Sequence, residues 1–343
     1  MVVKFIIMDL VPIKNISDEN WDELISQFDT KCLFHQSAWL TFIERTQRGE
    51  KLLLEIRKNN KIVGYFAGFI LHKGHFRILG SPLVGWGTEY MGPIVNEDFN
   101  QITFLEALEE YCKSSKIDQL EFSNPVLNPE IMQSYGFQYT KGVTPMVNLS
   151  ADEETMWRKL PQKSCRYAIS KALKNGLTVE YENHPQVINE YYKQLIEVFA
   201  NKGLVPTYDF ARIQTLSDCL NEQDLLFTLQ VKYNDRIIAT GLFPHDDRYV
   251  YYWGGASYSE FRNLYPNELI QWTLMKMAAK RGITKYHMGG GSNPFKTKWG
   301  GELIDTYHWY KSYNPLAKIA RSTYRWQFRT FQKIKGFIRK YAR

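Results

Sequence analysis

Hydrophobic and polar positions divide the first half of the chain into short strands and amphipathic helices. The runs KLLLEIR and IVGYFAGFI alternate as strands do and are joined by a Lys-Asn-Asn-Lys turn, whereas ITFLEALEEYCKSS has helical spacing. The predicted elements are a strand at 3–8, helices at 18–28 and 36–47, strands at 51–57, 62–70 and 76–80, a helix at 102–115, a strand at 119–123, and a short helix and strands to 149.

The same order of elements returns in the second half. Asn-Asp and Asp-Asp pairs separate its three central strands, and Pro266 and Gly282 mark the two ends of its last long helix. The predicted elements are a strand at 177–182, helices at 189–200 and 209–220, strands at 225–233, 236–243 and 248–255, a helix at 267–282, and strands at 285–288 and 302–311. Two halves with one element order predict a duplicated α/β fold with mixed sheets.

Composition and cysteine spacing fit a folded protein of the reducing cytosol. Of the 343 residues, 44% are hydrophobic and 15% aromatic, and a chain of this length favours two domains. The four cysteines are far apart, and the histidines form no ligand pair except a weak His72/His75 pair, so we expect no disulfide scaffold and no metal. No run of about 18 apolar residues, the length needed to cross a bilayer, is present.

The positive charge is concentrated at the C-terminus. The net charge is +7, but Lys311 to Arg343 contain ten Lys or Arg residues and no acid. The preceding 310 residues therefore carry 33 basic against 36 acidic side chains. A body with this balance gives little support to broad electrostatic capture of nucleic acid, although a local groove could still bind phosphate.

The segment HMGGGSNPFKTKWGGE, residues 287–302, carries the clearest candidate chemistry. Five glycines surround Lys296 and Lys298. Glycine permits close approach to the main chain, so two ammonium groups on a hairpin-like loop with bare backbone N–H groups nearby predict an anion site. The alternative is a surface turn with solvated lysines.

Four motifs in order resemble those of FemABX-type transferases and related proteins with the GNAT acyltransferase fold. They are FHQSAWL (34–40), the basic segment LPQKSCRYAISKALKNGLTV (160–179), YPNELIQWTLMKMAAKRGI (265–283) and FKTKWGGEL (295–303). The resemblance implies two tandem GNAT-like domains, placed at 1–150 and 151–313, followed by a basic helical tail at 314–343.

The resemblance also implies a transferase that joins an acyl or aminoacyl group to an amine of a cell-envelope precursor docked between the domains. Such chemistry needs a donor for the developing oxyanion, for which Lys296 is the candidate, and a route for the proton. His287 is a candidate proton acceptor, although a strand histidine beside a turn is more often structural. The predicted substrate-binding residues are Lys163, Arg166, Tyr252, Trp253, Asn267, Phe295, Lys298 and Trp299.

No tightly bound cofactor is expected, and the donor is either an aminoacyl-tRNA or an acyl thioester of CoA or of acyl carrier protein. The chain reads SEFRNLYP before Asn267, without the glycines that let CoA-dependent GNAT enzymes approach a diphosphate closely. Two alternatives remain open at this point. One is a thioester-dependent N-acyltransferase acting on an amino sugar of a surface polysaccharide, and the other is a non-catalytic GNAT-like binding protein.

The tail, residues 315–343, has an amphipathic helical pattern. Its predicted apolar face consists of Leu316, Ala320, Tyr324, Phe328, Phe331, Ile334, Ile338 and Tyr341. Its predicted basic face consists of Lys318, Arg321, Arg325, Arg329, Lys333, Arg339, Lys340 and Arg343. This pattern predicts a cytoplasmic protein that contacts an anionic membrane peripherally; docking on the protein body and contact with tRNA are the alternatives. A chain that ends at Asn314 is expected to stay folded.

Overall fold

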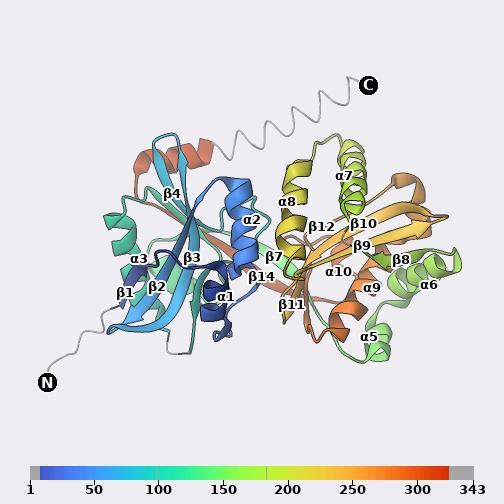
Figure 1. Cartoon of the computed structure of the whole chain (residues 1–343), viewed down its shortest axis with the longest axis horizontal. Coiled ribbons are helices and arrows are strands. Elements are labelled where there is room, and N and C mark those ends of the chain that lie inside the picture. The colour runs from blue at the N-terminus through green and yellow to red at the C-terminus, as the bar shows by residue number, and fades with distance from the viewer. Residues whose placement is uncertain (1–7, 98, 183, 324–343) are drawn as a thin grey trace. The chain divides into compact units, whose positions relative to one another are not determined.

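The computed structural model describes residues 8–97, 99–182 and 184–323, which form two compact units (Figure 1). Unit 1 consists of Met1–Gly142 together with Asp305–Thr323, and unit 2 contains Val143–Ile304. Within the described ranges, every helix is too short or too polar to cross a membrane.

Unit 1 is an α/β unit with one sheet. Its elements are β1 (Met8–Pro12), α1 (Asp18–Ser26), η1 (Leu33–His35), α2 (Ser37–Gln47), β2 (Glu50–Lys58), β3 (Lys61–Lys73), β4 (Phe76–Ser81), β5 (Gly92–Val95), α3 (Gln101–Ser114), β6 (Gln119–Phe122) and α4 (Pro129–Ser134). The strands pair in the order β1-β2-β3-β4-β6-β14, and β5 pairs with β3. Strands β7 (Gln138–Asn148) and β14 (Glu302–Ser312) carry the chain from one unit to the other.

Helix α3 shows how the sequence pattern builds the core of unit 1. Asn100 precedes the helix, and its side chain accepts a hydrogen bond from the Thr103 N–H, which satisfies one of the exposed donors of the first turn. Phe104, Leu105 and Leu108 recur on one helical face and are fully buried. Burying each such side chain contributes about 1.5–3 kcal/mol, so this face holds the helix on the sheet.

Unit 2 contains a four-stranded sheet and a second group of paired strands. Its elements are α5 (Glu153–Lys159), η2 (Gln162–Arg166), α6 (Tyr167–Lys174), β8 (Thr178–Tyr181), α7 (Pro185–Ala200), α8 (Phe210–Asn221), β9 (Leu226–Tyr233), β10 (Arg236–Pro244), β11 (Tyr249–Tyr251), β12 (Gly254–Ser257), η3 (Ser259–Leu264), α9 (Pro266–Lys280), β13 (Lys285–His287) and α10 (Pro294–Thr297). The four-stranded sheet has the order β12-β10-β9-β8, and β7, β13 and β11 pair in that order. Apolar residues of α9 and β9 share one buried core.

The structure confirms the predicted α/β class and the repeated order of elements. The turn Asn59–Asn60 joins β2 to β3, and Asn234–Asp235 joins β9 to β10; all four residues have positive φ, which a tight hairpin turn requires. Strand β5 was not predicted, because its glycine and proline indicated a loop. The predicted strand at 3–8 lies outside the described residues except for Met8.

The boundaries of the two units differ from the predicted domains at 1–150, 151–313 and 314–343. The first boundary falls after Gly142, within β7. Residues from Asp305 onward lie in unit 1, because β14 pairs with β6, where Trp309 is opposite Phe122. Both side chains are fully buried in the core of unit 1.

The described start of the tail, residues 315–323, is a helix that packs on unit 1. Ala317 is buried, whereas Leu316 and Ile319 are 65% and 62% exposed. Arg321 lies on the face that packs on the unit, where its Nε donates to Glu121 Oε1 at 2.7 Å and its guanidinium stacks 3.5 Å from the centroid of the Tyr310 ring. Arg321 is therefore not on a free basic face, as the helical pattern predicted, whereas Leu316 is exposed as a membrane-facing residue would be.

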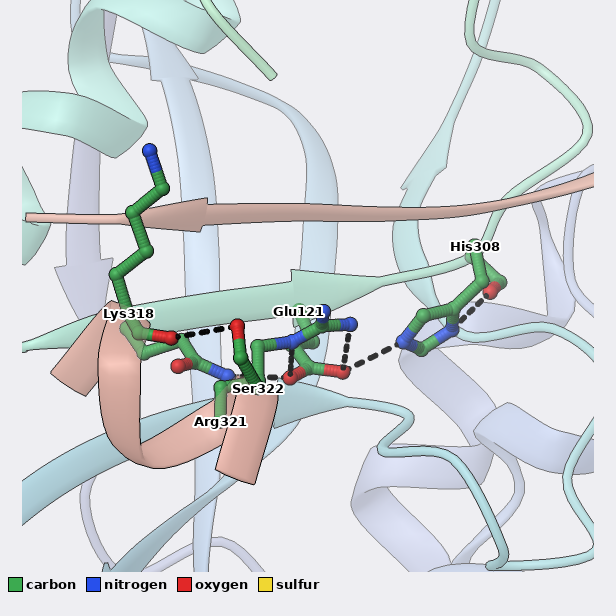
Figure 2. A network of polar contacts seen from close by, with 7 residues as sticks. Glu121, His308, Lys318, Arg321 and Ser322 are labelled. Atoms are coloured by element: carbon green, nitrogen blue, oxygen red, sulfur yellow. Dashed lines mark hydrogen bonds and ion pairs between the residues drawn. The ribbon is translucent and has the colours of Figure 1, made fainter. Parts of the chain in front are cut away.

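Glu121 is the centre of the network that holds Arg321 (Figure 2). Arg321 and His308 lie on either side of its carboxylate, and His308 Nε2 is 2.7 Å from Glu121 Oε2. His308 Nδ1 in turn lies 2.9 Å from Ser123 Oγ. Burial alone would raise the pKa of Glu121, but the hydrogen bonds from His308 and Arg321 outweigh it and lower this pKa to about 2. The ionised carboxylate of Glu121 therefore stabilises the folded state. Its contribution is complete above the pKa of an exposed glutamate and is lost as the pH falls toward 2.

Replacing Arg321 by Gln is expected to lower the free energy of unfolding of unit 1 by about 3 kcal/mol, because it leaves the buried carboxylate of Glu121 without its guanidinium partner. Lys318→Gln, on the exposed side of the same helix, is the matched control and should change stability by less than about 0.5 kcal/mol. Chemical denaturation at pH 7 measures both. Equal stability of the two variants would show that the Arg321 contact contributes little.

The position of Arg321 also changes what we expect of a chain that ends at Asn314, which the sequence predicts to stay folded. A chain that ends at Thr323 keeps Ala317 and Arg321 and should retain the hydrogen-exchange protection of β6. A chain that ends at Asn314 should lose protection there, since Glu121 stays buried without Arg321. Hydrogen exchange followed by mass spectrometry compares the two chains, and full protection after truncation at Asn314 would restore the expectation drawn from the sequence.

Candidate active site in unit 2

A break between β11 and β12 creates the framework of the candidate site. The sequence predicted one strand at 248–255, but β11 pairs with β13, in a parallel arrangement, and β12 pairs with β10. Tyr252 and Trp253 lie between the two strands. The ring of Trp253 packs 5.1 Å from the ring of Tyr208, and the ring of Tyr252 lies 6.5 Å from that of Phe295. Of these two predicted site residues, Tyr252 therefore lies beside the lysine segment.

Lys296 lies in α10, a single helical turn rather than the predicted hairpin-like loop. Asn293 caps this turn, and its side chain accepts a hydrogen bond from the Lys296 N–H at 3.0 Å. The Lys296 ammonium donates to the carbonyl oxygens of Gly289 at 3.2 Å and Gly290 at 2.9 Å, and it lies 5.8 Å from the centroid of the Tyr252 ring. The turn thus holds a cationic donor against the glycine run.

Several backbone N–H groups of the glycine run and the lysine turn, which the sequence suggested would be bare, are hydrogen-bonded. The N–H groups of Thr297 and Lys298 donate to carbonyl oxygens at the start of α10, and the Gly300 N–H donates to Thr297 O. The Gly291 N–H donates to Val143 O. With these N–H groups in use, Lys296 is the group of this segment best suited to bind an anion.

Lys298 forms an ion pair with Glu268 in the first turn of α9. Its Nζ is 2.6 Å from Glu268 Oε1, and the two side chains are only 19% and 15% exposed. The same ammonium lies 4.8 Å from the centroid of the Phe295 ring and 5.7 Å from that of Trp299. Lys298 therefore fixes the turn to α9 rather than presenting a free charge to a ligand.

Trp299 forms the buried base of the turn. It is 2% exposed, and its ring packs 6.4 Å from the ring of Phe295. Among the described residues, its buried Nε1 has no hydrogen-bond partner. This N–H is an unused donor beside the lysine turn.

The basic segment at 160–179 reaches the lysine turn through a cysteine. It folds as a π-helical turn, η2, followed by α6, and the thiol of Cys165 donates to Lys298 O at 3.4 Å. Burial raises the pKa of this thiol, which supports the interpretation of Cys165 as a plain helix cysteine. Lys163 is exposed, and the buried Nε of Arg166 has no hydrogen-bond partner among the described residues.

The start of α9 lacks the glycines and one of the N–H donors with which a helix N-terminus approaches a diphosphate such as that of CoA. Pro266 occupies the first helical position and has no N–H, and the N–H of Tyr265 donates to Arg262 O. Glu268 adds a carboxylate to the first turn, where it is paired with Lys298. The predicted ligand residue Asn267 donates from Nδ2 to Ser257 Oγ at 3.0 Å, a contact that ties α9 to β12.

His287 is buried next to the glycine run and Tyr252. It is fully buried in β13, and its Nδ1 accepts a hydrogen bond from the Gly289 N–H at 3.2 Å. Its carbonyl oxygen accepts from the Tyr252 N–H at 2.8 Å. These contacts set the shape of the glycine turn. The geometry therefore favours a structural role for His287 over a role as proton acceptor.

Sequence reasoning missed two features of the site. Glu268 belongs to the quoted motif YPNELIQ, and an acid in the first turn of a helix was the available signal. Tyr191 and Tyr208, whose hydroxyl groups are 3.1 Å apart behind Trp253, had no recognisable signal. A groove of about 530 Å³ beside α7 contains none of the predicted site residues.

Comparisons with known proteins identify the fold. Residues 162–297 match the sequence model of a family described as an acetyltransferase (GNAT) domain. A solved structure titled "Crystal structure of FemX" has a TM-score of 0.69 at 15% identity and covers 86% of this chain and 96% of its own. A tandem GNAT protein from the clavulanic acid biosynthesis pathway has a TM-score of 0.52 at 10% identity, covering 90% of this chain and 99% of its own. The fold is thus of the tandem GNAT type.

One curated relative adds similarity in sequence. Over 67 residues the chain is 40% identical to the lipid II:glycine glycyltransferase of Staphylococcus aureus, and the match covers 16% of this chain and 16% of that protein. Together with the family model and the FemX fold, this match confirms the predicted resemblance to FemABX-like GNAT proteins.

Removing the ion pair at the lysine turn is expected to loosen it. Lys298→Met should lower the free energy of unfolding of unit 2 by about 2 kcal/mol, because it leaves the half-buried Glu268 carboxylate without its charged partner. The amides of residues 294–300 should then exchange faster with solvent. Lys298→Arg, which keeps a cation at this position, is the matched control, and unchanged exchange in Lys298→Met would contradict the assigned role.

Proposed function

We propose that the protein is a transferase that forms an amide bond on an amino group of a peptidoglycan precursor. The observation that carries the proposal is the position of Lys296, held by a capped helical turn against the Gly289–Gly290 carbonyls in the domain that matches the GNAT family. The local identity to a lipid II:glycine glycyltransferase supports the class of acceptor.

The proposed reaction is attack of a neutral primary amine on the carbonyl carbon of an activated acyl group. A C–N bond forms, the bond from that carbon to the leaving oxygen or sulfur breaks, and the proton lost by the amine ends on the leaving group. Negative charge develops on the carbonyl oxygen, and the Lys296 ammonium would exchange its hydrogen bonds with the glycine carbonyls for one to this oxygen. Burial raises the pKa of the neighbouring Tyr252 to about 12, so its phenol stays neutral at pH 7 and can donate a hydrogen bond.

An aminoacyl ester of tRNA is the proposed donor. Pro266 and the carboxylate of Glu268 make the start of α9 a poor site for the diphosphate of CoA. Arg166, with its buried unpartnered Nε, and the exposed Lys163 are the proposed phosphate contacts of the substrates. Phe295 and Trp299 are proposed to line the reaction site.

A thioester-dependent N-acyltransferase acting on an amino sugar is the second candidate. The description of the matched family as an acetyltransferase favours it. Incubating the purified protein with charged tRNA, acyl-CoA and lipid-linked precursors, with mass spectrometry of the products, tests both. Transfer that RNase abolishes supports the first candidate, and RNase-resistant transfer from acyl-CoA supports the second. No transfer from any donor would contradict both and favour a binding protein.

Peripheral contact with an anionic membrane through residues 315–343 stays a prediction. Residues 324–343 lie outside the described part of the chain. In the described part, the exposed Leu316 and Ile319 are the side chains suited to such a contact.

Lys296→Ala is expected to reduce transfer about 10²–10³-fold, the usual effect of removing one oxyanion donor. Thermal stability should change little, since the lysine is half-buried in a short turn. Lys280→Ala, at the exposed end of α9, is the control and should transfer normally. Equal activity of Lys296→Ala and the parent protein would show that Lys296 has only a structural role in the glycine turn.

A further inference from the structure

The groove of about 530 Å³ beside α7 is lined by none of the residues of the lysine turn. Its lining comes from the chain after β8, the start of α7 and the hairpin that joins β9 to β10. Val187 and Ile237 form an apolar part of this lining, and the other lining residues are polar or charged. The groove is therefore a candidate site for a ligand that combines a charged group with a short apolar chain.

Ion pairs already balance three of the charged residues that line the groove. The pairs are Lys232 with Glu180 at 2.5 Å, Arg236 with Glu260 at 2.9 Å, and Glu190 with Lys193 at 2.6 Å. His184 adds no charge, because its Nδ1 accepts a hydrogen bond from the Gln186 N–H at 3.2 Å and so carries no proton. The other acids of the lining therefore set its net charge.

Two further acids make the groove negatively charged. Glu182 and Asp235 are exposed and form no ion pair of their own within the described part of the chain. Both act on Lys232: the hydrogen bond with Glu180 raises the pKa of this lysine most, and the charges of Glu182 and Asp235 raise it further. Three carboxylates thus share one ammonium group, and a second cation supplied by a ligand would balance the excess.

Gln230 provides a buried hydrogen-bond acceptor in the same groove. This side chain is 1% exposed, and its Nε2 donates to Glu180 Oε2 at 2.9 Å. The hydrogen bond from Lys232 lowers the pKa of Glu180, so its carboxylate is ionised at pH 7 and can only accept, which fixes the orientation of the Gln230 amide. Gln230 Oε1 is then buried with no hydrogen-bond partner among the described residues. An N–H group of a ligand would satisfy this acceptor.

We infer that the groove binds an alkylammonium group, the chemistry of a lysine side chain or of a linear diamine. The ammonium donates to Gln230 Oε1, and Glu182 and Asp235 balance its charge. The methylene chain packs on Val187 and Ile237. This site goes beyond the proposed function, since it shares no residue with the lysine turn.

The test is an NMR titration of the isotope-labelled full-length protein with Nα-acetyl-lysine methylamide and, separately, with cadaverine. The backbone amide signals of residues 182–190 and 230–237 should shift with increasing probe, and the affinity should fall as salt rises. The methylamide of Nα-acetyl-norleucine, which keeps the chain and lacks the ammonium, should leave these signals unchanged. A lower Kd for the lysine probe identifies a polypeptide lysine as the ligand, and a lower Kd for cadaverine identifies a free diamine.

Two variants separate the contributions of charge and of the buried acceptor. Glu182→Gln/Asp235→Asn should raise the Kd about fivefold, since two exposed charge contacts are lost. Gln230→Met, which keeps the volume and removes the acceptor, should raise it about tenfold. Glu222→Gln, an exposed acid outside the groove, is the matched control and should bind like the parent protein. The double variant changes exposed residues only, so it decides the question even where Gln230→Met does not fold.

Three results would overturn the inference. One is the absence of shifts at residues 182–190 and 230–237 with either probe, including a response confined to residues 289–299 of the lysine turn. Another is an equal Kd for the parent protein, the double acid variant and Glu222→Gln. The third is an equal response to the norleucine and lysine probes, which would make the contact purely apolar. The titration involves no acyl donor, so its failure is distinguishable from a failure of transfer.

Discussion

The ion pair between Lys298 and Glu268 is the contact on which the geometry of the candidate site depends. It joins the lysine turn to the first turn of α9 at 2.6 Å, and both side chains are mostly buried. A one-turn helix such as α10 has too few hydrogen bonds to be stable alone. Its position therefore comes from contacts outside it: the Asn293 cap, the thiol of Cys165 and this ion pair. Together with the hydrogen bonds from Lys296 to the Gly289 and Gly290 carbonyls, these contacts fix the position of Lys296.

The same ion pair also affects which donor the site can accept. Glu268 lies at a helix N-terminus, where the helix dipole favours a carboxylate. That is the position at which a GNAT fold that uses CoA needs an anion from its ligand. The ion pair that orders the lysine turn thus places a carboxylate of the protein itself at this end of α9. In the proposed function, the phosphates of the donor lie elsewhere, at Lys163 and Arg166.

The elements that sequence predicted well are those with a local physical signal. The hairpin at Asn59–Asn60 and helix α3 follow from turn residues and from hydrophobic spacing, and both formed as expected. The break after Tyr251 had no such signal, because a continuous aromatic and apolar run is compatible with one strand or two. At the site, the glycines around Lys296 predicted that this lysine lies close to the main chain, and its ammonium does contact the Gly289 and Gly290 carbonyls. The partner of Lys298 was not, because Glu268 is thirty residues away and no local pattern links the two.

The tail shows why charge counted along a sequence overstates the charge available to a partner. Ten basic residues follow from Lys311 onward, but the first and third of them are neutralised within unit 1. Lys311 pairs with Glu109, and Arg321 pairs with Glu121. Of the basic residues described in this region, Lys318 alone is exposed. A helical wheel assigns Lys318 and Arg321 to one basic face, yet a buried carboxylate some 200 residues earlier in the chain takes Arg321 out of it. The wheel describes what an isolated helix would expose, whereas the acids of unit 1, on α3 and on β6, decide which of these cations remain for a partner.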